Sequence, residues 1–174
     1  MFKRINIASI VKDHFRTLRS LNQSYNFINW KDIILFIVIP LSLAIFITYE
    51  GYNFKQQVGN LIAATAIFGG FLFNLLAIIY GQINNIKEDA EREASELKKK
   101  FVKEIHTNIS FCIVLSIFIV LSLLLTTIDI PNFIFHTIIE KIFIVINYYL
   151  MIIFVLTLMM VLNRVYVLLK KDAE

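Results

Sequence analysis

The sequence predicts an all-α integral membrane protein: a four-helix bundle with an N-terminal amphipathic interfacial helix and a charged helical cytoplasmic loop between the second and third spans. Of its 174 residues, 58% are hydrophobic and 17% are charged, whereas a soluble domain carries about 25% charge. The mean hydropathy is +0.72. The charged residues leave four uncharged runs, each close to the roughly 17–25 residues that a spanning helix needs. We therefore divide the chain into a cytoplasmic or interfacial segment, residues 1–31, and a four-span membrane domain, residues 32–174.

The predicted spans are residues 33–49, 60–80, 109–127 and 143–162. The first is the shortest and contains Pro40, which predicts a kink because proline removes a backbone donor that neighbouring groups in a membrane protein can replace. The residues before this span are rich in polar side chains and show no small-residue cleavage site. We therefore expect no signal peptide and a retained first span.

Lysine and arginine predict the orientation of the spans. All but two of the 17 Lys and Arg residues lie before the first span, between the second and third, or after the fourth. The two exceptions are Lys55 and Lys141. By the positive-inside bias, both termini and the central loop are cytoplasmic. The net charge of +4 then follows from topology and from attraction to an anionic lipid membrane, and we expect no direct nucleic-acid binding.

Apolar residues recur at spacings of three and four before the first span, which predicts an amphipathic helix at the interface, ending near residues 22–24. The apolar line is Ile7, Val11, His14, Leu18, Leu21, Tyr25 and Ile28. A histidine within such a line indicates a packed or interfacial side chain and not a metal ligand.

Basic residues off that line predict lipid contact. Lys12, Arg16 and Arg19 flank the apolar line, and Trp30 precedes the first span, where an aromatic ring suits the membrane interface. A helix that binds a protein partner is the alternative interpretation.

The segment 82–105 is the most informative polar region. It contains no glycine or proline, and Glu88 with Arg92 is an i,i+4 pair in the favourable order, so we expect a helix. This helix starts with an N-cap at Asn85, or the second span simply continues. Two arrangements fit: a cytoplasmic stalk of two helical extensions, or a segment lying flat on the lipid that turns upward near residues 107–108. Its basic residues form a solvated face or dock a cytosolic partner: Lys98, Lys99, Lys100 and Lys103.

Small residues form a stripe along the second span. At spacings of three and four, they fall on one helix face, and the stripe comprises Gly59, Ala63, Ala66, Gly70, Asn74, Ala77 and Gly81. Small side chains let helix backbones approach closely within lipid. The stripe therefore packs against the other spans of one subunit, joins copies of the chain into a homo-oligomer, or lines a water-filled pore. Thr65 and Gly69 offer a second register on an adjacent face.

Amides inside the membrane indicate contact with protein or water, because an amide facing lipid is costly. Asn74 and Asn147 are the two deeply placed amides, and a contact between them is one option. The third span adds lesser polar candidates, which are Ser110, Ser116, Ser122 and Thr126.

The sequence gives no sign of an enzyme. The predicted span interiors contain no Asp, Glu, Lys, Arg or His, which argues against intramembrane proteolysis and ion-coupled transport. The single cysteine, Cys112, lies inside the third span and permits neither a disulfide framework nor a cysteine-rich metal site. His136 and Glu140 are too few ligands for a metal. We expect no catalytic residues, no metal and no cofactor.

Three functions fit: a non-catalytic membrane subunit that senses or anchors at the envelope and works with a cytosolic partner, a small oligomeric channel or membrane-permeabilising effector, and a membrane assembly or lipid-organising factor. The four spans, the cytoplasmic ends, the charged loop 82–105 and the Ile/Phe/Asn/Lys-rich composition resemble the small membrane subunits of bacterial phage-defence operons, such as the membrane component of the Kiwa system. The resemblance rests on architecture over most of the chain. It implies a bacterial inner-membrane location and a tetramer-like assembly that monitors the envelope with a cytosolic effector.

Overall fold

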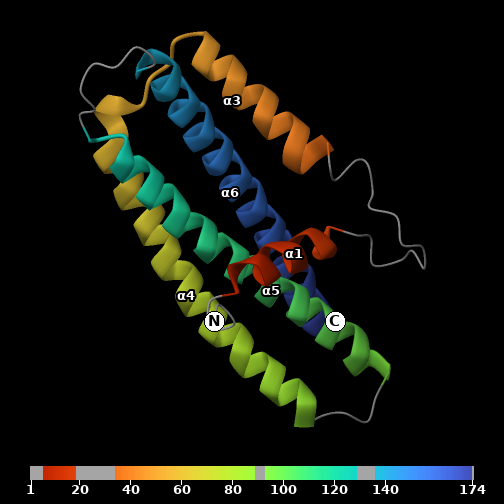
Figure 1. Ribbon diagram of the computed structural model, residues 1–174. Helices are drawn as coiled ribbons and strands as arrows, with labels where there is room; N and C mark the ends of the chain where they lie inside the picture. Colours follow the sequence, from red (N-terminus) through yellow and green to blue (C-terminus); the bar gives the residue numbers. More distant parts are fainter. Residues whose placement is uncertain (1–5, 19–33, 89–92, 129–135, 174) are drawn as a thin grey trace.

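The computed structural model describes residues 6–18, 34–88, 93–128 and 136–173 of the chain. Side chains are described for these residues except 82–98, 136, 168, 169 and 171–173. All regular structure in this part is helical, as predicted (Figure 1). The elements are α1 (Ile7–Thr17), the π-helical turn η2 (Ile34–Val38), α3 (Ile39–Tyr49), the 3-10 turn η3 (Lys55–Gln57), α4 (Val58–Glu88), α5 (Glu93–Leu125) and α6 (His136–Ala173).

Three of these helices are long and apolar enough to cross a membrane, and they coincide with the second, third and fourth predicted spans, except that the third ends at Leu125 and not at residue 127. Their membrane-capable parts are Lys55–Gly81, Lys99–Leu125 and Thr137–Val167. The chain is therefore a helical membrane protein. The first predicted span corresponds to the shorter apolar segment Ile34–Tyr49, which rises about 24 Å as a helix, less than the roughly 30 Å of a bilayer's hydrocarbon core.

Pro40 explains why the first apolar segment is not one regular α-helix. It lies at the start of α3, in the first two helical positions, where a missing N–H costs least. The preceding turn, η2, is π-helical, a departure from regular geometry of the kind that accompanies a proline in a longer helix.

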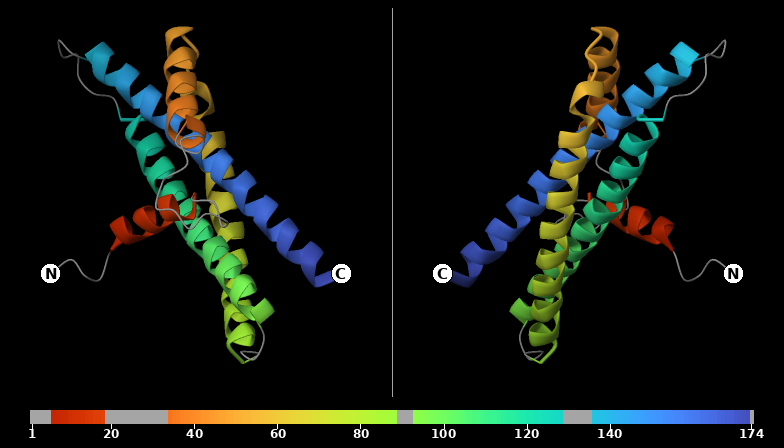
Figure 2. Two further views of the ribbon diagram at one scale, coloured as in Figure 1. Left: turned by 90° about the vertical axis from the view of Figure 1, so that its right-hand side faces the viewer. Right: turned by 90° about the vertical axis from the view of Figure 1, so that its left-hand side faces the viewer.

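The helices pack in the order α4, α5, α6, α3, with α1 lying across α5 (Figures 1 and 2). Neighbours in this row are antiparallel, because α4 and α6 run in one direction and α3 and α5 in the other. Helix α5 therefore lies inside the row, whereas α4 and α3 lie at its two edges. Half of the apolar part of α5 is buried, against 22% for α4 and 22% for α6.

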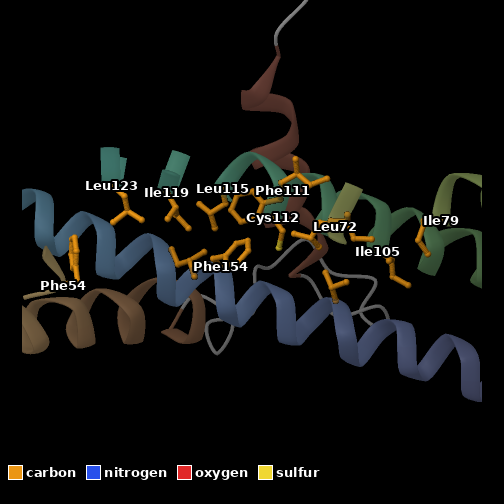
Figure 3. Packing of buried hydrophobic residues seen from close by; sticks show 14 of the residues in the cluster. Phe54, Leu72, Ile79, Ile105, Phe111, Cys112, Leu115, Ile119, Leu123 and Phe154 are labelled. Atoms are coloured by element: carbon orange, nitrogen blue, oxygen red, sulfur yellow. The ribbon is translucent and has the colours of Figure 1, made fainter. Parts of the chain in front are cut away.

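The core follows from this order, because α5 supplies most of the fully buried side chains. Figure 3 shows buried side chains gathered between α5 and α6. Its fully buried apolar residues are Val102, Ile105, Ile109, Cys112, Ile119 and Leu123. The neighbours add Leu72 and Ile79 from α4 and Phe154 from α6.

The segment 82–105 is helical on both sides of residues 89–92, which lie outside the described residues. Helix α4 runs without interruption to Glu88, so the predicted N-cap at Asn85 is wrong and the alternative, a continuing second span, is correct. Helix α5 runs continuously from Glu93 to Leu125, so the chain does not turn at residues 107–108. Of the two predicted arrangements, the pair of helical extensions is the one observed (Figure 1).

An ion pair joins η3 to the first turns of α6 at the end of the bundle that lies opposite the α4–α5 connection. Lys55 Nζ lies 2.6 Å from Glu140 Oε1. The Phe54 and Tyr148 rings meet edge to face with centroids 5.2 Å apart. Helix α6 begins at His136, and its Glu140 is engaged by a lysine.

Candidate functional site

A buried polar cluster forms where α1 meets α5 and α6, and we call it the polar junction. Helix α1 contributes His14 and Thr17, α5 contributes Glu104 and Asn108, and α6 contributes Arg164. His14, Thr17 and Asn108 are 1%, 7% and 0% exposed. Buried polar groups persist in a structure when they are hydrogen-bonded, so these partners specify where α1 lies.

Asn108 is the hub of the junction. Its Oδ1 lies 2.9 Å from His14 Nδ1 and 2.7 Å from Thr17 Oγ1. The Thr17 hydroxyl also lies 2.8 Å from the His14 backbone carbonyl, so its single proton is shared between two acceptors. One amide on α5 thus holds two consecutive turns of α1.

The His14 ring is enclosed by aromatic side chains from three elements. It stacks on Phe111 of α5 with centroids 3.8 Å apart and an interplanar angle of 3°. Phe15 of α1 and Phe36 of η2 meet it edge to face, at 5.5 Å and 6.2 Å. The pKa of His14 is lowered from 6.5 to about 4, chiefly by burial; the hydrogen bond to Asn108 raises the pKa, and the Arg164 charge lowers it. The prediction of a packed histidine is confirmed.

Arg164 joins the C-terminus of α1 to α5. Its Nη2 donates to the Thr17 carbonyl at 2.8 Å, and its Nη1 lies 3.0 Å from Glu104 Oε2. A cation at a helix C-terminus interacts favourably with the last carbonyls and with the helix dipole. The Arg164 and Glu104 side chains are 15% and 14% exposed, so each charge depends on the other for compensation.

This arrangement supports attachment of α1. The imidazole is 1% exposed and stacks on Phe111. Within the described residues, no three His, Cys, Asp or Glu side chains come close enough together to hold a metal ion. The polar junction therefore fixes three elements at one point of the fold.

The small-residue stripe on α4 faces away from the rest of the subunit. All seven stripe positions are exposed: Gly59, Ala63, Ala66, Gly70, Asn74, Ala77 and Gly81. A Cβ built at Gly59, Gly70 or Gly81 meets no atom within 4 Å. The prediction that the stripe packs against other spans of the same subunit is therefore wrong.

The second register carries the contact inside the subunit. Thr65 is 7% exposed, and a Cβ at Gly69 would lie 3.1 Å from Ser116 Oγ of α5. The stripe lies about 120° around the helix axis from this face, at 100° per residue. Helix α4 therefore has two faces of small residues, one used within the subunit and one left at the edge of the row.

The two deep amides do not meet. Asn147 is fully buried in α6, where its Nδ2 donates to the Phe143 carbonyl at 2.9 Å. Asn74 is exposed on α4, and no hydrogen bond joins it to any residue that the structure describes. The proposed pairing of Asn74 with Asn147 is wrong within one subunit.

Hydroxyl groups on α5 bond to their own helix and do not form a polar path through the subunit. Ser110, Ser116 and Thr126 donate to the carbonyls of His106, Ile113 and Leu123. Ser116 is buried, and Ser110, Ser122 and Thr126 are partly buried. These groups pack between helices.

The predicted basic contact residues are partly described. Lys12 and Arg16 on α1 are exposed, as are Lys99, Lys100 and Lys103 on α5. The side chain of Lys98, and the residues Arg19 and Trp30, lie outside the described part of the structure. The described basic side chains are therefore accessible to lipid or to a partner.

Sequence reasoning missed four members of the junction. Thr17, Glu104, Asn108 and Arg164 lie up to 147 residues apart, and their spacing carries no shared pattern. The available signal was their position: Glu104, Asn108 and Arg164 each lie within a few residues of the end of a predicted span, at the same end of the bundle as His14.

Comparisons with protein-family models, with curated proteins and with solved structures gave no match for this chain.

Proposed function

We propose that the chain is a non-catalytic, oligomeric subunit of the bacterial inner membrane that self-associates through the outward face of α4 and works with a cytosolic partner. The observation that carries this proposal is the exposure of all seven stripe positions on a helix that is long and apolar enough to cross a membrane. Contact with lipid does not require a stripe of Gly and Ala, because lipid tails pack equally well against Leu or Ile. It gains a close backbone contact when a second helix covers it.

Asn74 supports the same proposal. Its amide projects from the middle of the stripe and has no hydrogen-bond partner among the described residues of the subunit. An interhelical hydrogen bond in a membrane contributes about 0.6 kcal/mol on average and up to about 1.7 kcal/mol. A second copy that brings its own Asn74 to this face satisfies both amides.

The position of α4 in the row allows this contact. Helix α4 packs on α5, and its opposite side lies at the edge of the row (Figure 2). The close approach of Gly69 to Ser116 supports the ability of small residues on this helix to bring backbones together. A second copy would repeat that geometry on the stripe.

The end of the bundle with α1 and the α4–α5 connection is the proposed cytoplasmic end, following the positive-inside bias. Lys12 and Arg16 are exposed there and are available to anionic headgroups. Lys99, Lys100 and Lys103 are exposed on α5 and are available to a cytosolic protein. In the antiviral setting that the architecture suggests, the assembly senses or anchors at the envelope and passes the signal to that protein.

A matched pair of substitutions tests self-association. Ala66 and Ala64 are both exposed on α4, but Ala64 points about 120° away from the stripe. The native mass in nanodiscs is measured for the wild type, Ala66→Leu and Ala64→Leu. We expect a multiple of the 20.3 kDa chain for the wild type and Ala64→Leu and a shift toward one copy for Ala66→Leu. A single copy in the wild type contradicts the proposal.

The cytosolic partner is tested by charge reversal. We expect a cytosolic protein that co-purifies with the wild type to be lost when Lys99, Lys100 and Lys103 are changed to Glu. Lys141→Glu is the control, because Lys141 is exposed near the other end of α6. Equal recovery with the triple variant, or equal loss with the control, contradicts this part of the proposal.

A further inference from the structure

Helix α1 is attached to the membrane helices through one face and a few contacts. It has 11 residues, and helices of this length are marginal in water without tertiary contacts. Its buried residues are His14, Thr17 and Leu18, whereas Lys12, Asp13 and Arg16 are exposed. The helix therefore depends on the polar junction to stay in place.

Of these contacts, the one made by His14 is the most sensitive to a change of charge. The ring is 1% exposed and stacked on Phe111. An imidazolium at this position would carry its charge among aromatic rings and beside the Arg164 cation. Burying a charge without full compensation costs more than burying a neutral polar group.

The charged groups around His14 do not offer that compensation. From α6 it faces Arg164, which is itself a cation. From α5, Glu104 lies against Arg164, and the Asn108 Oδ1 accepts a hydrogen bond from His14 Nδ1. On α1, Asp13 is paired with Arg16 at 3.2 Å on the exposed side, and η2 contributes the apolar ring of Phe36.

A second histidine near this point, His106, lies on α5 but on a different side of that helix from Asn108. It is separated from Asn108 by about 200° around the axis at 100° per residue and is half-buried. Lys103 and Lys100 on α5 are exposed. Among the described titratable groups at the α1 contact, His14 is the most deeply buried, at 1% exposed, whereas Glu104 and Arg164 are 14% and 15% exposed and compensate each other.

We propose that α1 is a latch that stays closed on α5 and α6 while His14 is neutral and opens when a proton charges the ring. Opening uncovers Phe111 and Asn108 and releases Arg164 from the Thr17 carbonyl. The latch acts within one subunit and does not depend on the self-association proposed above.

The sign of the response follows from the direction of the His14 pKa. The docked pKa, about 4, is lower than the ordinary value of 6.5. Docking is therefore complete above pH 6.5 and is weakened as the pH falls from 6.5 toward 4. With these two values, the closing equilibrium is about 70-fold weaker at pH 4.5 than at pH 7.5.

Distances between spin labels test the latch in the full-length protein in nanodiscs. Labels are attached at Ala8→Cys on α1 and Tyr166→Cys on α6, both exposed positions, with the buried Cys112 changed to Ala. We expect one narrow distance at pH 7.5 and a broad, longer distribution at pH 4.5, with a midpoint between pH 4 and 6.5.

Three variants separate His14 from other acid-sensitive groups. His14→Gln keeps an amide for Asn108, and His14→Phe keeps an aromatic ring. Neither takes up a proton, so whichever is closed at pH 7.5 remains closed at pH 4.5. Glu104→Gln removes the nearest carboxylate, and we expect it to open with the wild-type midpoint.

The proposal is overturned if the wild type keeps its pH 7.5 distance at pH 4.5, or if a His14 variant that is closed at pH 7.5 opens with the wild-type midpoint. It is also overturned if Glu104→Gln abolishes the opening. If both His14 variants are open at every pH, an unchanged wild-type midpoint in Glu104→Gln supports the latch.

Discussion

Two adjacent glycines, Gly69 and Gly70, have opposite surroundings. A Cβ at Gly69 would lie 3.1 Å from Ser116 Oγ, whereas a Cβ at Gly70 meets nothing within 4 Å. We expect Gly69→Leu to destabilise the subunit by about 1–3 kcal/mol, as overpacking does, and Gly70→Leu to leave the isolated subunit unchanged.

This difference is measured as the apparent melting temperature of each variant in detergent, under conditions where the wild type has been dissociated to single copies. Equal melting temperatures for Gly69→Leu and the wild type would show that the α4–α5 contact is not formed as described.

The ion pair between Arg164 and Glu104 is the second residue-scale prediction. We expect Arg164→Gln or Glu104→Gln to lower the free energy of unfolding by about 2 kcal/mol, less than the roughly 3–5 kcal/mol for a fully buried pair, because both side chains keep some contact with water. The double variant should cost less than the sum of the two single changes.

A double-mutant cycle from unfolding titrations in mixed micelles measures this coupling. Additive losses would mean that the two charges do not interact.

The long helices could be predicted at the element scale, because uncharged runs and length determine them directly. The extensions of α4 to Glu88 and of α5 from Glu93 also follow from a helix-favouring segment without glycine or proline. The predicted end of the N-terminal helix, near residues 22–24, is wrong, because α1 ends at Thr17. The polar junction holds α1 up to Thr17, and this junction depends on side chains from α5 and α6.

Among the described long helices, α3 packs against α6, and its fully buried residues are Pro40 and Ala44. We expect Ala44→Leu to separate α3 from α6, because a large side chain prevents close helix approach in a membrane. Ser42→Leu, at an exposed position of the same helix, should have little effect.

Cysteine cross-linking between α3 and α6 measures this contact. An unchanged yield in Ala44→Leu would contradict the placement of α3.

The order of the helices in the row could not be predicted from the sequence. The spacing of the small residues along α4 fits a contact inside the subunit and a contact between copies equally well. Only the packing shows that Thr65 and Gly69 face α5 and that Ala66 and Gly70 face outward. The proposed self-association depends on this difference between two faces of one helix.

Oxidative cross-linking in native membranes tests the outward face of α4 most directly. Single cysteines are placed at Ala66, Gly70 or Ala64 in a Cys112→Ala background. We expect a covalent dimer from Ala66→Cys and Gly70→Cys and none from Ala64→Cys. Equal dimer yields at the three positions, or no dimer at Ala66 and Gly70, would contradict an interface built on the stripe.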